Sequence, residues 1–339
     1  MLRTSDFDYN LREELIAQNP VAGRDCSRLL VLHRKNAKIE HRIFKNVDEY
    51  LGPDDLLVLN NTKVIPARLI GYKETGGKIK VLLLSKIKDD IWEVLVDRGH
   101  GIKVGKTLEF GKELKAQIIE EPKEGGIAKL RFYYNGEFFK VLESLGEIPL
   151  PPYIKNFKFQ IPNLKQRYQT VYAKVEGATA APTAGFHFTK SLLNKMKTKG
   201  INIAYITLHT GYATFKPVTA EYVQNHKMYK EYYIIPNETV AAIKSAKRVI
   251  AVGTTTVRAL ETMALRGEIK SQNGETDLFI YPPYKFKIVD ALITNFHFPR
   301  STLLMLVSAF GGHQFVMKAY QEAIKEKYRF YSFGDAMLI

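Results

Sequence analysis

The chain has 339 residues, enough for one large domain or two domains that each bury a hydrophobic core. Hydrophobic residues make up 45% and charged residues 25% of the sequence, which is ordinary for globular protein. The net charge of +15 favours a polyanionic partner such as nucleic acid, although lysine-rich proteomes also contain basic enzymes that bind no nucleic acid.

The number of cysteines and the N-terminal residues indicate the cellular compartment in which we expect the protein. Cys26 is the only cysteine, which excludes an intramolecular disulfide framework and any zinc site built from several cysteines. The first ten residues are polar, and no run of about 18 apolar residues is present, so we expect no signal peptide and no membrane span. A reducing, cytoplasmic location is expected.

The first predicted strands are residues 29–34 and 56–60, two short apolar runs of the kind found in buried strands. Residues 68–134 then predict six more short strands separated by turn residues such as Gly76-Gly77 and Asp89-Asp90. These six strands are 68–73, 78–87, 91–98, 107–111, 114–121 and 127–134. The pattern predicts an antiparallel meander that closes into a small barrel.

After Tyr153, strands alternate with helices, which predicts an α/β layer with a mainly parallel sheet. The predicted helices are 189–200, 237–246, 256–265 and 302–310, and the predicted strands are 201–208, 248–252 and 291–296. The expected fold class is therefore α/β: a discontinuous α/β domain with a mainly parallel sheet, plus an inserted six-stranded antiparallel β-barrel. We place the α/β domain at residues 1–65 and 153–339 and the barrel at residues 66–152.

Polar residues follow four of the predicted strands at the point where each strand ends. These strand ends are Asn60-Asn61-Thr62, His209-Thr210-Gly211, Gly253-Thr254-Thr255-Thr256 and Asn295-Phe296-His297. Ligands bind open α/β sheets at the carboxyl ends of the strands, where loops and helix N-termini meet. The convergence of these groups, rather than any one of them, predicts a functional site.

Each strand end also has a structural interpretation. Gly253-Thr254-Thr255 suits a tight turn and helix cap as well as a cradle of backbone N–H groups for an anion. Arg258, one turn further on, suits a structural ion pair as well as an anionic ligand. A lone His209 or His297 at a strand end is more often structural, and Asn60-Asn61 can form a simple Asx turn.

The segment GATAAPTAGFHFT, residues 177–189, is the least ordinary stretch of the chain. Small residues, Pro182 and Gly185 lead directly to His187, just before a predicted helix. Such a segment lets the backbone approach a ligand closely, and it is unusually hydrophobic for a plain loop, so we predict a function here. The sequence has no HExxH or GxSxG motif, which argues against zinc proteolysis and α/β-hydrolase chemistry.

Nine blocks, in order from end to end, resemble the S-adenosylmethionine:tRNA ribosyltransferase-isomerase family of queuosine biosynthesis. They include LLVLNNTKVIPARL and ALITNFHFPRSTLLMLVSAFGG, and they cover residues 5–20, 24–32, 56–69, 167–173, 177–189, 206–218, 249–261, 291–312 and 328–339. The sequence departs from the family pattern at Thr256, usually serine, at Tyr212-Ala213, usually two small residues, and in the loop 97–100. At Tyr229 a usual histidine is absent, so we give that position no catalytic role.

The resemblance implies a transferase-isomerase with an α/β domain and a six-stranded barrel. Such an enzyme transfers and isomerises the ribosyl moiety of S-adenosylmethionine onto 7-aminomethyl-7-deazaguanine at the wobble position of a tRNA. The products are epoxyqueuosine-tRNA, adenine and methionine. S-adenosylmethionine is a consumed co-substrate, so no cofactor and no metal are expected. The expected partners are S-adenosylmethionine and tRNA carrying the modified wobble base, with no membrane, and we expect a monomer.

This chemistry needs a base that removes the proton made acidic by the neighbouring sulfonium, and a group that protonates or hydrogen-bonds the departing adenine. His187, His209 and His297 are the candidate catalytic residues, because imidazole titrates near neutral pH. The candidate substrate-binding residues have three roles. Thr254, Thr255 and Arg258 would hold the methionine carboxylate, Asn60 and Asn295 would orient ribose or base, and Arg167 and Tyr168 would contact phosphate and stack on a base. A surface arginine beside a core tyrosine is the alternative for the last pair.

Two other functions stay open. A non-catalytic tRNA-binding protein would use the barrel and the basic surface, would bind tRNA regardless of S-adenosylmethionine, and would release no adenine. A base-exchange enzyme acting on small nucleosides would turn over without tRNA. The polar strand ends disfavour the first alternative, and the positive charge disfavours the second.

Overall fold

The computed structural model describes residues 1–97, 101–123, 125–155, 163–211, 214, 217–267 and 269–339. The chain divides into two compact units. Unit 1 consists of Met1–Thr62, Pro152–Val175 and Ala181–Ile339, and unit 2 consists of Lys63–Pro151 and Glu176–Ala180. Two of the departures from the family pattern, Tyr212-Ala213 and residues 98–100 of the barrel loop, lie outside the described residues.

Unit 1 is built around a nine-stranded sheet with the strand order β15-β13-β12-β3-β14-β16-β17-β1-β2. The four central strands β12, β3, β14 and β16 are parallel, whereas most pairs toward the two edges are antiparallel. The strand bounds are β1 Arg28–His33, β2 Lys38–Ile43, β3 Asp55–Asn60, β12 Asn202–Leu208, β13 Glu231–Ile235, β14 Arg248–Val252, β15 Gln272–Thr276, β16 Ala291–Asn295 and β17 Ala336–Leu338.

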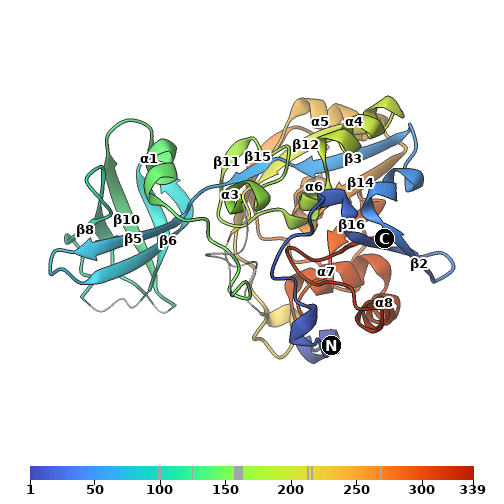
Figure 1. Ribbon diagram of the computed structural model, residues 1–339, viewed down its shortest axis with the longest axis horizontal. Helices are drawn as coiled ribbons and strands as arrows, with labels where there is room; N and C mark the ends of the chain where they lie inside the picture. Colours follow the sequence, from blue (N-terminus) through green and yellow to red (C-terminus); the bar gives the residue numbers. More distant parts are fainter. Residues whose placement is uncertain (98–100, 124, 156–162, 212–213, 215–216, 268) are drawn as a thin grey trace. The chain divides into compact units, whose positions relative to one another are not determined.

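Helices cover both faces of this sheet, and its central strands are accordingly apolar on both sides. Helix α4 packs against one face, and helices α7 and α8 pack on the other (Figure 1). Among the described residues of unit 1, the α-helices are α3 Leu164–Arg167, α4 Lys190–Thr198, α5 Asn237–Ser245, α6 Thr254–Leu265, α7 Thr302–Gly311 and α8 His313–Lys325. The described 3-10 helices are η1 Thr4–Phe7, η2 Glu13–Leu15, η3 Arg24–Cys26, η4 Phe44–Tyr50, η5 Thr183–His187 and η7 Val223–Asn225.

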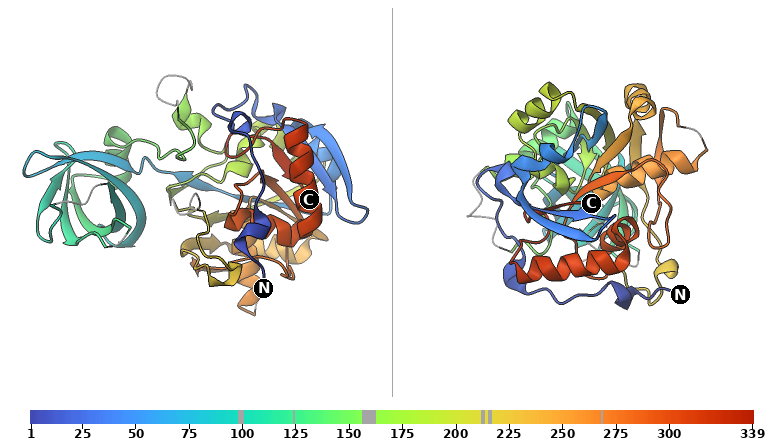
Figure 2. Two further views of the ribbon diagram at one scale, coloured as in Figure 1. Left: turned by 90° about the horizontal axis from the view of Figure 1, so that it is seen from below. Right: turned by 90° about the vertical axis from the view of Figure 1, so that its right-hand side faces the viewer.

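Unit 2 is a closed barrel with the strand order β10-β7-β6-β5-β8-β9, seen in cyan to green in the left view of Figure 2. The bounds are β5 Arg68–Lys73, β6 Lys78–Lys88, β7 Ile91–Asp97, β8 Thr107–Glu109, β9 Leu114–Glu120 and β10 Ile127–Tyr134. Every described pair is antiparallel, so the predicted six-stranded antiparallel barrel is confirmed. Helix α1 (Phe138–Leu145) follows the barrel, and β4 (Thr62–Val64) pairs with β11 (Val175–Ala178) in a separate sheet.

Two helices of unit 1 begin at a capping hydroxyl group. The hydroxyl groups of Thr189 and Ser301 accept hydrogen bonds from the N–H groups of Leu192 (3.0 Å) and Leu304 (3.2 Å), at the starts of α4 and α7. Helix α5 differs, because its N-cap residue is Pro236, which has no capping hydroxyl or amide group. None of the described helices combines the length and the apolar character that a bilayer span requires.

Candidate functional site

The four polar strand ends belong to four adjacent parallel strands. Strands β12, β3, β14 and β16 are neighbours in that order, so their carboxyl ends meet at one edge of the sheet. We call the polar residues at this edge the strand-end group: Asn60, Thr62, His209, Gly253, Thr254, Thr255, Asn295 and His297. The convergence that the sequence predicts is therefore present in the fold.

Asn60 links three of these strand ends. Its Oδ1 accepts hydrogen bonds from the N–H groups of Leu208 (3.0 Å) and Thr62 (3.1 Å), and its Nδ2 donates to the Leu208 carbonyl (3.0 Å) and to Thr255 Oγ1 (3.4 Å). The side chain is buried, and these bonds use its two donors and its two acceptor sites. Direct contact with a ribose or base therefore requires one of these bonds to break.

His209 lies at the end of β12 and is only partly buried. Its Nδ1 is 2.8 Å from Thr62 Oγ1, and its ring stacks on Tyr232 with the ring centroids 6.2 Å apart. Burial lowers the pKa of His209 below its ordinary value, which favours the neutral ring. With Nδ1 held by Thr62, Nε2 is the nitrogen that can exchange a proton with a ligand.

His187 reaches the strand-end group from η5. Its Nδ1 is 2.7 Å from Ser27 Oγ, and its Nε2 is 3.2 Å from Asn295 Nδ2. Because an amide nitrogen can only donate, Nε2 accepts here, which assigns the proton of the neutral ring to Nδ1. Burial, with a smaller contribution from Arg24, lowers the pKa of His187 to about 3.

His297 is held on several sides at the end of β16. Its Nε2 is 2.8 Å from Thr294 Oγ1, its backbone N–H donates to the Tyr320 hydroxyl (3.0 Å), and its carbonyl accepts from the Tyr9 hydroxyl. Burial lowers the pKa of His297 to about 3. The ring is therefore neutral at physiological pH.

Gly253 opens helix α6 at the end of β14. Its φ of +89° is a left-handed conformation that favours glycine, and it starts α6 at Thr254, two residues earlier than predicted. Gly253 has no side chain with which to cap this helix end, so the first N–H groups of α6 are suited to bind an anion. Thr254 and Thr255 occupy this first turn, in which we expect a carboxylate to bind.

Arg258 forms a buried ion pair with Glu231 of β13. Its Nε also donates to the Leu278 carbonyl (3.0 Å) and its Nη2 to the Thr276 carbonyl (3.3 Å), while Glu231 Oε1 accepts from the Gly211 N–H (2.9 Å). The structural ion pair weighed for Arg258 thus exists, and a ligand carboxylate has to share the guanidinium with Glu231. Glu231 did not stand out in the sequence, because only its position opposite α6 reveals its partner.

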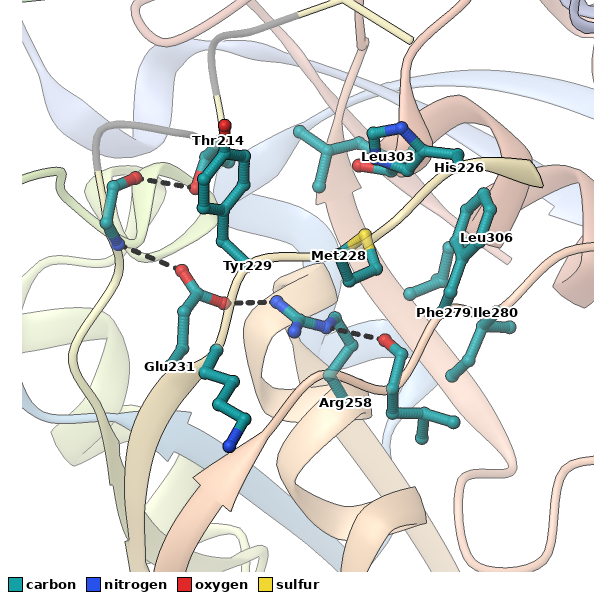
Figure 3. A pocket seen from close by; sticks show the side chains of 14 residues that line it. Thr214, His226, Met228, Tyr229, Glu231, Arg258, Phe279, Ile280, Leu303 and Leu306 are labelled. Carbon is teal, nitrogen blue, oxygen red and sulfur yellow. Dashed lines mark hydrogen bonds and ion pairs between the residues drawn. The ribbon is translucent and has the colours of Figure 1, made fainter. Parts of the chain in front are cut away.

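Arg258 and Glu231 form part of the wall of a pocket of about 70 Å³ (Figure 3). We call it the Arg258 pocket; its lining residues are Gly211, Thr214, His226, Met228, Tyr229, Lys230, Glu231, Arg258, Leu278, Phe279, Ile280, Thr302, Leu303 and Leu306. Most of the lining surface is apolar. The pocket adjoins the strand-end group, because Gly211 follows His209 by two positions.

Arg167 and Tyr168 do not line the Arg258 pocket. Arg167 donates to the carbonyls of Ala22 (3.1 Å) and Val21 and lines a small pocket of about 20 Å³ together with Arg24 and His187. Tyr168 has no exposed surface and packs edge-on against Phe186 and Phe333. A ring without an exposed face cannot stack on a base in this conformation, which favours the alternative of a core tyrosine.

Metal-binding side chains do not gather anywhere in the described part of the chain: no three His, Cys, Asp or Glu residues lie close enough together to hold an ion. The strand-end group offers imidazole, hydroxyl and amide groups, and the adjoining Arg258 pocket adds a guanidinium group. These groups can transfer protons and bind a carboxylate or a ribose.

Comparison with known proteins agrees with this geometry. A family model described as "Queuosine biosynthesis protein" matches residues 4–339. Proteins named S-adenosylmethionine:tRNA ribosyltransferase-isomerase from Thermoanaerobacter sp. (strain X514) and Thermotoga maritima are 54% and 53% identical to this chain, each over the whole of both chains. A crystal structure of S-adenosylmethionine tRNA ribosyltransferase from Thermotoga maritima has a TM-score of 0.57 and 44% identity, covering 99% of this chain and 100% of that chain.

The match to the family model spans nearly the whole sequence and covers both units, including the barrel strands and the four strand ends. The identity to the relatives is far above the level at which membership of a family becomes uncertain. The chain therefore belongs to the S-adenosylmethionine:tRNA ribosyltransferase-isomerase family of queuosine biosynthesis proteins, a family of transferase-isomerases.

Proposed function

We propose that the chain transfers and isomerises the ribosyl moiety of S-adenosylmethionine onto 7-aminomethyl-7-deazaguanine at the wobble position of a tRNA. The products are epoxyqueuosine-tRNA, adenine and methionine. The observation that carries this proposal is the strand-end group: four adjacent parallel strands deliver imidazole, hydroxyl and amide groups to one edge of the sheet. The names of the relatives support the pairing of S-adenosylmethionine with tRNA.

His209, His187 and His297 are the proposed acids and bases. His209 is the best placed to remove the proton next to the sulfonium, because Thr62 holds Nδ1 and leaves Nε2 for the substrate. His187 and His297 are neutral rings in buried sites and hydrogen-bond the departing adenine in this proposal, for which His187 has to exchange its bond to Ser27 or to Asn295. The tRNA-borne amine attacks the ribose, the glycosidic bond to adenine breaks, and the bond between the ribose 5′ carbon and sulfur breaks to release methionine.

The remaining candidates bind substrate in this proposal. Thr254 and Thr255 in the first turn of α6, with Arg258, hold the methionine carboxylate. Asn60 and Asn295 orient the ribose or the base, in part through the residues to which they are hydrogen-bonded. Arg167 contacts a phosphate of the tRNA.

The charge distribution supports RNA contact by unit 1. Unit 2 contains 16 Lys and Arg residues against 14 Asp and Glu residues, a net charge of +2, so unit 1 carries +13 of the total +15. Phosphate contacts by Lys and Arg dominate protein affinity for nucleic acid. We further propose that the enzyme needs no metal or cofactor and acts as a cytoplasmic monomer.

One assay tests the proposed function. The purified chain is incubated with S-adenosylmethionine, with and without tRNA that carries the modified base, and free adenine is measured by chromatography. We expect adenine only when that tRNA is present. Adenine release without tRNA would instead indicate an enzyme for small nucleosides, and tRNA binding without adenine release would indicate a non-catalytic binding protein.

A further inference from the structure

We propose that the Arg258 pocket binds the α-amino acid end of S-adenosylmethionine, with Glu231 holding the ammonium group and Arg258 holding the carboxylate. The apolar wall would contact the methylene chain and the sulfonium methyl group. This inference rests on the proposed function, because it takes S-adenosylmethionine as the substrate, and it adds Glu231 as a specificity-determining residue.

The first argument is the arrangement of charge. Arg258 and Glu231 are both more than nine-tenths buried and lie side by side in the pocket wall (Figure 3). An α-amino acid carries one ammonium and one carboxylate group on the same carbon. A zwitterion adds no net charge to the pocket, which avoids the large cost of burying an uncompensated ion.

The second argument is the remaining hydrogen-bonding capacity of the pair. The hydrogen bonds of Arg258 to Glu231, Leu278 and Thr276 use three of its five N–H groups. Glu231 accepts one hydrogen bond at each oxygen, from Arg258 and from the Gly211 N–H, and each carboxylate oxygen has a second acceptor site. Both groups can therefore bind a ligand without losing each other.

The third argument is the shape and chemistry of the rest of the wall. Six apolar side chains surround the charged pair: Met228, Leu278, Phe279, Ile280, Leu303 and Leu306. The volume of about 70 Å³ suits the small amino acid end of the substrate better than its bulkier nucleoside end. Phe279 also offers a ring to the sulfonium, since aromatic faces attract cations.

The fourth argument is location. Glu231 holds the N–H of Gly211, and Gly211 belongs to the same loop as His209. Arg258 stands in α6, whose first turn contains Thr254 and Thr255. A substrate anchored in this pocket therefore has its amino acid end beside the residues that we propose for proton transfer.

A purely structural role for the ion pair is the alternative, because the pair also connects α6 to β13. Such a role predicts that loss of the Glu231 charge weakens the binding of every ligand of the pocket by the same factor. Recognition of the ammonium group predicts instead a loss of discrimination between ligands with and without that group.

L-Methionine and two analogues separate these roles when they are titrated into the full chain and followed by NMR. One analogue, 4-(methylsulfanyl)butanoate, lacks the ammonium group, and the other, 3-(methylsulfanyl)propan-1-amine, lacks the carboxylate. We expect the wild type to bind methionine about 10- to 100-fold more tightly than either analogue, the usual effect of a hydrogen bond to a charged group. In Glu231→Gln, the preference over the butanoate should fall to about one, whereas Glu238→Gln, at an exposed position of α5, should keep it.

A second variant guards against misfolding of Glu231→Gln, in which Arg258 is left without its partner. Leu303→Trp fills the pocket from a partly buried position at the start of α7 and leaves the ion pair in place. We expect it to weaken methionine binding by at least about tenfold and to raise KM for S-adenosylmethionine, with an unchanged circular dichroism spectrum.

The results distinguish failure of the pocket assignment from failure of the proposed function. Wild-type methionine affinity in both variants, or equal binding of methionine and the butanoate by the wild type, overturns the pocket assignment, even where tRNA-dependent adenine release is intact. Absence of adenine release by a wild type that still prefers methionine overturns the proposed function and supports an amino acid site at Arg258 and Glu231.

Discussion

The histidines at the two ends of the row of strands β12-β3-β14-β16 differ in their burial and in their hydrogen bonding. At the β16 end, His187 and His297 are buried, their hydrogen-bonding partners are protein groups, and each has a pKa of about 3. At the β12 end, His209 is partly exposed and has Thr62 on one ring nitrogen only. One sheet edge thus combines two rigid neutral imidazoles with one accessible imidazole.

This difference suggests that the histidines at the two ends of the sheet edge have different chemical roles. A base is most effective when its pKa lies near the working pH, so a ring with a pKa of about 3 is a weak proton acceptor but a well-oriented hydrogen-bonding group. The Arg258 pocket adjoins the β12 end, whereas Arg167 and Arg24 lie near His187 at the β16 end. We therefore place the amino acid end of S-adenosylmethionine and the general base His209 at the β12 end, and expect contact with RNA at the β16 end.

The largest effect is expected from removal of the proposed base. His209→Ala should lower kcat for tRNA-dependent adenine release by roughly 10²- to 10⁴-fold, the range typical for loss of a general acid or base. His41→Ala, a histidine substitution in β2, is the matched control and should keep wild-type turnover. The same assay applies to His187→Ala and His297→Ala. Any of the three variants that turns over like the wild type with saturating substrates removes that residue from the catalytic group.

The second prediction concerns stability and pH at the β16 end. The pKa of His187 is about 3 in the folded protein, and the ordinary value in the unfolded chain is about 6.5, so the unfolded state binds more protons between these limits. The free energy of unfolding should therefore fall as the pH drops through this window, by about 1.4 kcal/mol per pH unit for this group.

Urea denaturation between pH 7 and pH 5 measures this linkage. His187→Gln lacks the titrating ring, so its free energy of unfolding should fall by about 2 kcal/mol less than that of the wild type between pH 7 and pH 5, because the effect begins only below the unfolded pKa of about 6.5. His209→Gln, at the accessible end, is the comparison and should change the pH dependence less. Parallel pH profiles for His187→Gln and the wild type would show that His187 is not a buried neutral ring.

Most of the fold could be predicted from sequence patterns that extend over only a few residues. The barrel strands, the caps Thr189 and Ser301 and the four polar strand ends all produce signals within a few residues, through alternation, turn residues or capping hydroxyls. Strand β15 is different, because its sequence QNGET is polar and contains a glycine, which is unfavourable for a strand. It forms a strand because β13 pairs with it, and that pairing leaves no local signal.

The site was predictable as a place but not as a set of contacts. Strand topology brings Asn295 to His187 and Glu231 to Arg258, although neither pair is close in sequence. The sequence also could not separate Arg167 from Tyr168, two adjacent residues of one motif. Phe186 and Phe333 bury the tyrosine, and their positions depend on the tertiary fold.

The third prediction tests whether Asn60 stabilises the end of β12 through its hydrogen bonds to the Leu208 backbone. Asn60→Ala leaves the Leu208 backbone groups without their partner, so it should lower the free energy of unfolding by about 1–3 kcal/mol in urea denaturation at pH 7. Asn46→Ala, at a half-buried position of η4 where the amide donates a hydrogen bond to Glu49, is the control and should have a smaller effect. Wild-type stability of Asn60→Ala together with a raised KM for S-adenosylmethionine would make Asn60 a direct ligand contact instead.

The smallest expected effect tests the placement of RNA at the β16 end. Arg167→Met removes one cation that we propose to contact a phosphate, so a plot of log affinity for tRNA against log salt concentration should become shallower by about 0.7–0.9. Lys80→Met changes one cation in barrel strand β6 and should leave the slope unchanged if unit 1, which carries most of the net charge, binds the RNA. A slope that changes with Lys80→Met and not with Arg167→Met would assign the RNA contact to the barrel.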